Sequence, residues 1–377
     1  MKNLNIQRQL PKAVIRSAPA DFVVEEVAAY PPSGVGEHVY VTFRKTGLTT
    51  PEAVKRLAQA LGVDPRDAGH AGMKDRHAVT TQTVSLQVPL AVDAEKMLGA
   101  ASPEAVEILS VARHTNKLKP GHLHGNRFAI TLRDLDPSLV NKVIEDLSGI
   151  AAKGVPNTFG PQRFGRDGDN ASRALAWIRG EARGPRDRNE QRLLFSALQS
   201  SWFNEVLDIR ENEGTWNRIV PGDLAKKTDT GGIFLVPLSG PETDDAVLRG
   251  QTAQLTPTGP MFGKKMRWPE GHPAEIESQV LRAAIGDPAL LDAWAHLGEG
   301  TRRPLVMPVE SLSCELVSPP DGAAPSALIV RFTLPKGGYA TTVLSRVVNW
   351  TDATVAHKRG EQSAQSVCSD SKNEASG

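Results

Sequence analysis

The amino-acid sequence predicts an α+β fold: a core around a mainly antiparallel mixed sheet, with a second α+β domain inserted into it. Two patterns predict this fold. Strand-like alternation and helix-like periodicity are interleaved over residues 21–150, and the connections are too short for successive parallel crossovers. Alternation then returns at residues 328–334, after a middle stretch of different character. A chain of 377 residues is long enough for two such domains.

Several segments are expected to be strands because apolar residues alternate with more polar ones. The clearest is residues 38–44, in which Val39, Val41 and Phe43 share one face. Further strands are expected at residues 21–27, 84–88, 128–132 and 328–334. Residues 125–127 are expected to turn the chain into the strand that begins at Phe128.

Helices are expected where apolar residues recur every three or four positions. The first begins with Thr50 as its N-cap, Pro51 at the first helical position and Glu52 as an early acid, and it ends at Gly62. Further helices are expected from the apolar positions within residues 139–150, 191–210 and 273–297. The Gly/Pro-rich residues 221–223 and 256–260 are expected to be irregular, and residues 64–81 are expected to form a loop.

Composition narrows the function classes. Hydrophobic residues make up 40% and charged residues 23%, which is typical of a globular enzyme, whereas a net charge of +1 does not decide the partner. Two cysteines, Cys314 and Cys368, exclude a disulfide framework or a thiolate-rich metal site and fit a reducing cytoplasm. No apolar run suits a signal peptide or a membrane span. The polar tail beyond Gly360 is expected to be disordered.

The densest group of reactive side chains lies in residues 71–82, Ala-Gly-Met-Lys-Asp-Arg-His-Ala-Val-Thr-Thr-Gln. Asp75 is flanked there by Lys74, Arg76 and His77, on a loop that leads into a strand. Three adjacent charged residues most often form an ordinary solvated turn. The small and apolar residues on either side are not what a solvated turn needs, and they favour a built site.

Three further segments are suited to RNA. Residues 113–133 carry Arg, Lys and His without an acid, as a phosphate track does, although a basic solvated loop explains them equally well. Residues 154–165 present Phe159, Arg163 and Phe164, which could stack on bases or form a small core. Residues 332–341 form a strand and a glycine turn that present Tyr339. Phosphate-binding glycine loops, a nucleophile-elbow serine and a zinc-deaminase motif are absent.

Together, and in order from about residue 20 to about residue 343, these segments resemble the TruD family of tRNA pseudouridine synthases. The most specific element is Ala-Gly-Met-Lys-Asp-Arg-His-Ala-Val-Thr, which contains Asp75. Thr158 departs from the family, which usually has an aromatic residue there, and so do Ser345, Arg346 and Val347. Supporting elements are Asp21-Phe22-Val23-Val24-Glu25, Gly36-Glu37-His38, Gly121-His122-Leu123-His124-Gly125-Asn126, Phe159 to Gly165, Gly300-Thr301-Arg302-Arg303 and Gly338-Tyr339-Ala340-Thr341.

The resemblance implies a discontinuous pseudouridine synthase domain at residues 1–153 and 308–352, a TRUD-type inserted domain at residues 154–307 and a disordered tail at residues 353–377. It also implies isomerisation of uridine 13 of tRNA without a metal or cofactor. Asp75 would be the catalytic carboxylate, acting either as a nucleophile or as a general base. The partner is expected to be tRNA, and the protein is expected to be a cytoplasmic monomer that does not bind membranes.

The family's substrate contacts fall on Phe22, Asn126 and Tyr339, which are expected to line the uracil pocket. Arg16 is expected to pair with Asp75. Lys74, Arg163 and Phe164 are further expected substrate contacts. Two other functions stay open: a tRNA-binding or remodelling protein without catalysis, and a nucleoside or glycoside hydrolase. A hydrolase usually needs two carboxylates about the scissile bond, and no spacing in the sequence pairs Asp75 with a second one.

Overall fold

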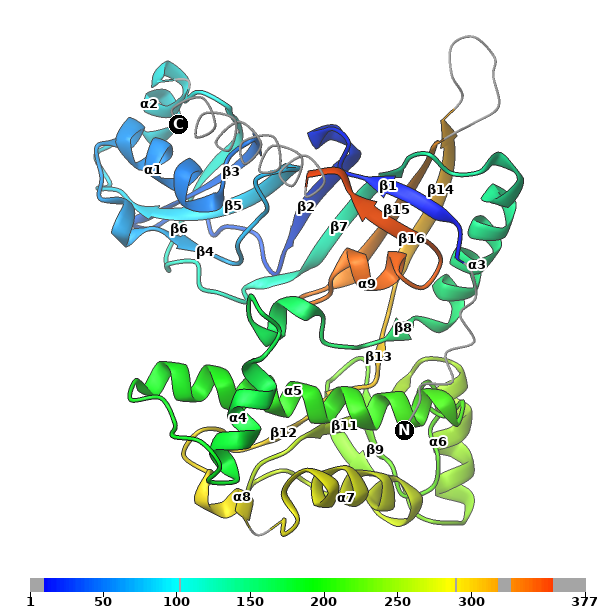
Figure 1. Cartoon of the computed structure of the whole chain (residues 1–377). Coiled ribbons are helices and arrows are strands. Elements are labelled where there is room, and N and C mark those ends of the chain that lie inside the picture. Colours follow the sequence, from blue (N-terminus) through cyan, green and yellow to red (C-terminus); the bar gives the residue numbers. More distant parts are fainter. Residues whose placement is uncertain (1–9, 102, 289, 318–326, 355–377) are drawn as a thin grey trace, which may run out of the picture. The chain divides into compact units, whose positions relative to one another are not determined.

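The structure is a computed structural model that describes residues 10–101, 103–288, 290–317 and 327–354 (Figure 1). The chain divides into two compact units. The first combines the residues up to Ala152 with those from Val309 onward, and the second is Lys153–Pro308. The domain borders expected from the sequence differ from these by one residue. Apart from Ala353 and Thr354, the expected disordered tail lies outside the described residues.

An eight-stranded sheet forms the first unit, and only the β2–β5 pair in it is parallel. The predicted α+β fold with a mainly antiparallel mixed sheet is therefore confirmed. The order is β14-β15-β7-β2-β5-β3-β6, with β4 paired to β5 beyond the point where β2 leaves it. The strands are β2 (Phe22–Ala28), β3 (His38–Thr46), β4 (Gly69–His70), β5 (Val79–Gln87), β6 (Val106–His114), β7 (Leu123–Leu132), β14 (Glu310–Val317) and β15 (Ala327–Pro335).

One face of this sheet is the core face. Val41 and Phe43 of β3 pack there with α1 (Thr50–Leu61) and α2 (Ala94–Ala101). Successive side chains of a strand point to opposite faces, so Lys45 lies on the same face as Phe43, where it is 1% exposed. A charged side chain so deeply buried needs partners, and these lie in the functional site.

Helix α1 begins one residue earlier than the capping pattern suggested. Thr49 is the N-cap, and its Oγ1 accepts a hydrogen bond from Glu52 N–H, while Thr49 N–H donates to the Glu52 carboxylate. The expectation that Thr50 caps the helix is therefore wrong. Two consecutive threonines compete for the cap, and Thr49 has the matching acid three residues later. Thr50 is left as a helical residue whose hydroxyl can bind another segment.

Two loop expectations are also wrong. Residues 125–127 lie inside β7 rather than in a turn before it. Gly125 is needed there because a Cβ at this position would lie 2.1 Å from the carbonyl oxygen of Leu334 on β15. Residues 64–81 contain a short helix η2 (Pro65–Asp67), β4 and the start of β5, so Asp75 lies on a shorter loop between β4 and β5.

Both ends of the described chain meet in a separate parallel pair, β1 (Lys12–Ile15) with β16 (Asn349–Asp352). In this pair Ile15 is opposite Asp352. The remaining elements of the first unit are η1 (Pro19–Asp21), η3 (Pro137–Leu139), α3 (Val140–Lys153, whose last residue belongs to the second unit) and α9 (Ala340–Leu344). No described helix is long and apolar enough to cross a membrane.

The second unit has a four-stranded sheet and a long helix, α5 (Arg188–Asn212), whose Trp202 and Leu198 pack against α7 (Gly271–Ile285). Residues 256–260 lie in its strand β11, although they were expected to be irregular. Their prolines are tolerated because each half of β11 pairs on one side only, first with β9 and then with β12. The other elements are β8 (Val155–Pro156), η4 (Pro161–Phe164), α4 (Asn170–Ile178), β9 (Leu224–Lys227), β10 (Ile233–Leu235), α6 (Pro241–Gln251), β11 (Leu255–Met261), α8 (Leu290–Ala293), β12 (Thr301–Pro304) and β13 (Val306–Met307).

Candidate active site around Asp75

The carboxylate of Asp75 is held at one oxygen and open at the other. Its side chain is 65% exposed, and Oδ2 lies 2.8 Å from Nη2 of Arg16. Among the described residues, Oδ1 has no hydrogen-bond partner. The backbone at Asp75 is also fixed, because Nζ of the buried Lys45 donates to the carbonyl oxygens of Asp75 (2.9 Å) and Leu48 (2.6 Å). The loop therefore presents a carboxylate whose direction is set while one oxygen stays accessible.

Arg16 is itself held from three sides. Nη1 lies 2.8 Å from Oδ2 of Asp352, and the guanidinium carbon lies 4.0 Å from the centre of the Phe22 ring. Arg16 has a φ of 59°, a left-handed conformation that costs a non-glycine residue about 1–2 kcal/mol. Such strain persists only where surrounding contacts over-determine it, and the contacts with Asp75, Asp352 and Phe22 do so.

Asp352 is mostly buried, with 12% of its side chain exposed. Burial raises the pKa of this carboxyl, but hydrogen bonds from Thr354 and Arg16 outweigh burial and leave the pKa below its ordinary value. Asp352 therefore carries a negative charge against Arg16 at neutral pH. One guanidinium thus joins a buried carboxylate from the C-terminal strand to the exposed carboxylate of Asp75.

Lys74, the neighbour of Asp75, points into the sheet. Its Nζ lies 2.5 Å from Oδ1 of Asn126 on β7 and 3.1 Å from Oε2 of Glu26 on β2, which are opposite each other in the strand pairing. The side chains of Lys74 and Glu26 are 6% and 4% exposed. The backbone N–H of Lys74 donates to Oγ1 of Thr50 at 2.9 Å. The ammonium group of Lys74 is thus already bound by side chains of the protein itself.

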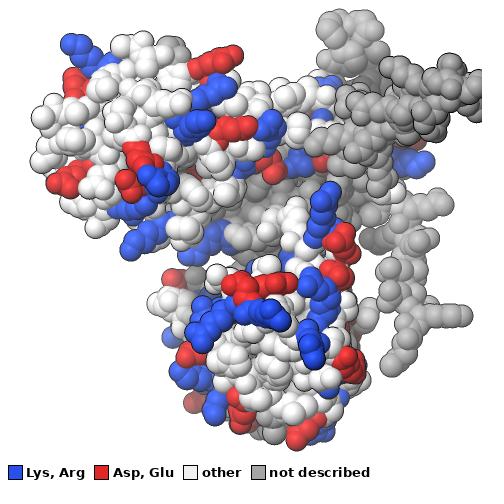
Figure 2. All heavy atoms as spheres, turned by 60° about the vertical axis from the view of Figure 1, so that its left-hand side comes forward, with Lys and Arg blue, Asp and Glu red and all other residues white. Residues whose placement is uncertain are grey.

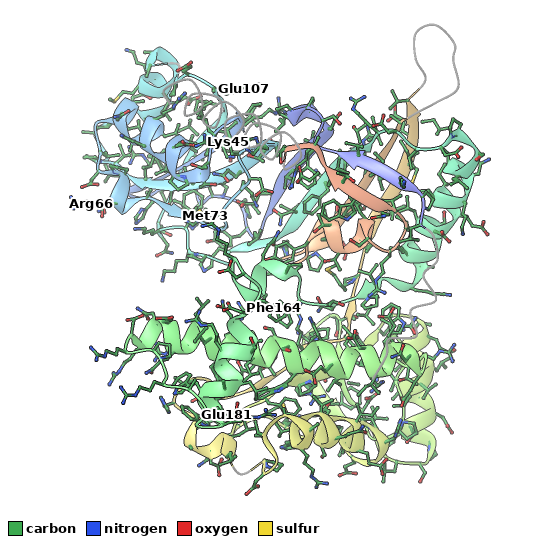
Figure 3. All side chains as sticks on the ribbon, viewed as in Figure 1. Lys45, Arg66, Met73, Glu107, Phe164 and Glu181 are labelled. Carbon is green, nitrogen blue, oxygen red and sulfur yellow. The ribbon has the colours of Figure 1, made fainter. Side chains whose placement is uncertain are left out.

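Burial also changes the chemistry of Lys45. Desolvation is the largest cause, and it lowers the pKa of Lys45 to about 8, although the charges of Asp75 and Glu52 oppose the change. Figure 3 labels Lys45 on β3 and Met73 on the loop that follows β4, two residues before Asp75. Met73 is 68% exposed, so this loop carries an apolar side chain into solvent beside the carboxylate.

The structure brings most of the expected site residues into the first unit. Arg16 pairs with Asp75 and lies over the Phe22 ring, and Lys74, the neighbour of Asp75, contacts Asn126. Phe22 is only 4% exposed, since Arg16 covers its ring and Phe128 meets it edge-on at 6.3 Å. Tyr339 is 45% exposed and precedes α9 at the end of the turn after β15. Among the described residues, no contact joins the Tyr339 ring to the others.

Arg163 and Phe164 belong to the second unit. Arg163 is fixed against α5, where its Nε donates to Oγ of Ser200 at 3.1 Å and its Nη2 donates to Oγ of Ser196. Phe164 ends η4 and is half-buried (Figure 3). Phe159 packs edge-on against Phe203, so the small-core explanation of this aromatic pair applies to Phe159.

The arginines of the basic stretch at residues 113–133 are engaged within the protein. Arg113 donates to the carbonyl oxygens of a neighbouring loop, Arg127 pairs with Glu25, and Arg133 pairs with Asp21. Lys117 and Lys119 have no acidic partner in the described part of the chain. They are therefore the freer candidates for phosphate. On the face shown in Figure 2, basic and acidic side chains are interspersed over each unit.

Four residues that contact the site were not found from the sequence: Lys45, Glu26, Asp352 and Thr50. Thr50 had been expected to cap a helix, and not to accept a hydrogen bond from the loop that carries Asp75. The alternation of Val39, Val41 and Phe43 would have placed Lys45 on the core face had the expected strand, residues 38–44, been extended by one residue. No local pattern marks Asp352, because its role depends on the pairing of β16 with β1.

The arrangement suits acid–base or nucleophilic chemistry by one exposed carboxylate. Within the described ranges, no group of three or more His, Cys, Asp or Glu could hold a metal ion. A second carboxylate, that of Asp352, pairs with the same arginine as Asp75. It is mostly buried and already bound by Thr354 and Arg16. It does not offer the open pair of carboxylates that a glycosidase needs.

Comparisons with known proteins give one answer. A family model described as "tRNA pseudouridine synthase D (TruD)" matches residues 11–184 and 181–347. A tRNA pseudouridine synthase D of Anaeromyxobacter sp. (strain Fw109-5) is 41% identical over 342 residues, covering 89% of this chain and 92% of that protein. One from Thermus thermophilus is 40% identical over 334 residues, covering 89% and 88%. A crystal structure titled as TruD from Methanosarcina mazei has a TM-score of 0.74 at 22% identity, covering 91% of this chain and 95% of that one.

Proposed function

The chain belongs to the TruD family of tRNA pseudouridine synthases, and from this premise we propose that Asp75 is the carboxylate that performs its chemistry. Enzymes of this family isomerise uridine in tRNA to pseudouridine, and this chain is one of them. The observation that carries the proposal is the geometry of Asp75: Arg16 fixes Oδ2 while Oδ1 is open on an exposed loop. We further propose that the substrate is uridine 13.

The reaction breaks the N1–C1′ bond of uridine, turns the uracil and joins C1′ to C5. The C5 proton is lost, and N1 gains a proton, so no redox step occurs. Asp75 supports this sequence either as a nucleophile, through Oδ1, or as a base that removes a sugar proton. Arg16 holds the carboxylate in one orientation, and Lys45 holds the loop backbone, which favours a single approach to the substrate.

A uridine inside a helix cannot reach a carboxylate, so the target base must leave its stack. We assign Tyr339, which is exposed, to stacking on the uracil and Asn126 to hydrogen bonding with its edge. Phe22 contributes to the site because its ring supports Arg16. Lys74 contributes because its ammonium group donates a hydrogen bond to Asn126. Arg163 and Phe164 are proposed RNA contacts from the second unit. The protein is proposed to act in the cytoplasm as a monomer.

The test is release of tritium from tRNA transcripts labelled at uridine C5. The wild type is expected to release the label, and Asp75→Asn is expected to release none while still binding tRNA. Asp67→Asn is the matched control, since Asp67 is an exposed carboxylate on the same connection between α1 and β5. Its release should equal that of the wild type.

Two outcomes would contradict the proposal. If Asp75→Asn released label at the wild-type rate, another residue would perform the chemistry. If neither protein released label while both bound tRNA, the chain would be a tRNA-binding protein without this activity.

A further inference from the structure

Met73 is an apolar side chain that the fold leaves in water beside Asp75. It lies on the loop that follows β4 (Figure 3), and its exposed fraction of 68% is the highest among the large apolar side chains in the described part of the chain. Packing within the protein therefore does not explain a methionine at this position. Single exposed apolar residues are common on protein surfaces, so a role for Met73 depends on how it is held and where it lies.

The backbone on both sides of Met73 is anchored. Ala71 is buried, and its carbonyl oxygen accepts a hydrogen bond from Gly121 N–H at 2.8 Å. Lys74 N–H donates to Oγ1 of Thr50 at 2.9 Å. The ammonium group of Lys74 is bound as well, by side chains of the sheet. A loop fixed on either side of Met73 has little backbone freedom left to lose when the methionine meets a ligand.

Met73 and Asp75 are both turned to solvent, whereas Lys74 between them points into the sheet, where 6% of its side chain is exposed. Such alternation is typical of an extended segment. Two residues of extended chain span at most about 7 Å. Successive nucleotides of a stacked strand are about 3.4 Å apart, so Met73 reaches the nucleotides next to the one that meets Asp75.

We propose that Met73 is a wedge, an apolar side chain that enters the base stack of the tRNA beside the target uridine while that uridine is unstacked. The inference deepens the proposed function and rests on it, because a reaction at a stacked uridine requires extrusion of the base. Proteins that unstack bases insert apolar side chains between them, and methionine is among the residues used. Its unbranched, polarisable side chain adapts to the face of any base. The wedge promotes extrusion, and the chemistry stays with Asp75.

The rate of tritium release in a single turnover, with enzyme in excess, tests the wedge. The probes are two tRNA transcripts: in one the target uridine is paired with adenine, and in the other that adenine is replaced so that the uridine is unpaired. Met73→Ala should slow release from the paired transcript about 10-fold and leave the unpaired one near the wild-type rate, because an unpaired base leaves the stack more easily. Met97→Ala is the matched control, since Met97 is an exposed methionine on α2, and it should change neither rate.

Two further variants separate apolar character from length. Met73→Leu keeps an apolar side chain of similar volume and should retain most of the rate on the paired transcript. Met73→Gln keeps the length but adds a polar amide, and it should behave like Met73→Ala. A second readout does not need turnover: 2-aminopurine placed beside the target uridine gains fluorescence as it loses stacking. Binding of the wild type should produce this gain, and Met73→Ala should produce a smaller one.

Equal rates for the wild type and Met73→Ala on the paired transcript would overturn the proposal. Equal slowing on both transcripts would also overturn it, because Met73 would then act on the Asp75 loop and not on extrusion of the base. Turnover of the unpaired transcript shows that each variant is folded. Failure of the proposed function is distinguishable, since the wild type would then release no tritium while the 2-aminopurine signal still reports unstacking.

Discussion

Arg16 connects three parts of the chain that are far apart in sequence. Its guanidinium bridges Asp75 and Asp352 at 2.8 Å each and lies over the Phe22 ring. Exposed ion pairs contribute little to stability, and the Arg16–Asp75 pair alone would be an example, since Asp75 is 65% exposed. The pair with Asp352 differs because both side chains are mostly buried. We therefore expect Asp352 to fix Arg16, and Arg16 in turn to orient Asp75.

Asp352→Asn tests this chain of contacts at the residue scale. The variant keeps the size of the side chain but loses the charge that holds Arg16, so the orientation of Asp75 becomes less defined. We expect kcat for tritium release to fall by about 10- to 100-fold with little change in KM for tRNA. Glu315→Gln, which breaks an exposed pair with Arg331, is the control and should leave kcat unchanged. A 10- to 100-fold rise in KM for tRNA with unchanged kcat would instead assign Asp352 to RNA binding.

At the scale of elements, the adjacent threonines at the start of α1 have different tasks. Thr49 caps the helix together with Glu52. Thr50 uses its hydroxyl to accept the N–H of Lys74 at 2.9 Å and to donate to Gln82 on β5 at 3.1 Å. One helix end therefore stabilises itself and also anchors the loop that carries Asp75.

Thr49→Ala and Thr50→Val should separate the two tasks. Loss of the cap should lower the free energy of unfolding by about 1 kcal/mol and leave kcat near that of the wild type. Thr50→Val keeps the shape of the side chain but leaves Lys74 N–H without its acceptor, and kcat should fall several-fold. Urea denaturation and tritium release on both variants are the measurements. Equal effects of the two variants on kcat would show that the loop depends on the helix as a whole.

Element prediction succeeded where the pattern is local. The strand at Val39–Phe43 and the helix ending at Gly62 depend on alternation, on periodicity and on a glycine with φ of 65°, and each was found within one or two residues. Strands β6 and β11 were not predicted, each for a different reason. Strand β6 lacks clear alternation, and β11 contains prolines that only its one-sided pairing tolerates.

At the scale of the whole molecule, net charge says little about RNA binding. The chain carries +1, and both signs are interspersed on the surface in Figure 2. Affinity for tRNA must then come from local groups such as Lys117 and Lys119. The arginines of the same stretch are engaged with carboxylates or backbone carbonyls, which lowers their availability to phosphates.

Salt dependence of tRNA binding tests this view. The logarithm of the association constant should fall steeply with the logarithm of salt concentration, and Lys117→Ala with Lys119→Ala should reduce the slope by about 1 for each lysine. Lys142→Ala is the control, because Lys142 pairs with Asp146 on α3. A slope that stays the same in the double variant would place the phosphate contacts elsewhere, for example at Arg163.

The sequence by itself determined the fold class, the family and the position of Asp75, because alternation, helix periodicity and the motif around Asp75 are local properties of the chain. It also named Arg16, Phe22 and Asn126 as candidate site residues. Only the tertiary structure decided how they act together. The pairing of β1 with β16 brings Asp352 to Arg16, and the pairing of β2 with β7 sets Glu26 beside Asn126 to receive Lys74. These contacts join residues tens to hundreds of positions apart, and strand pairing over such distances leaves no periodic signal in the sequence.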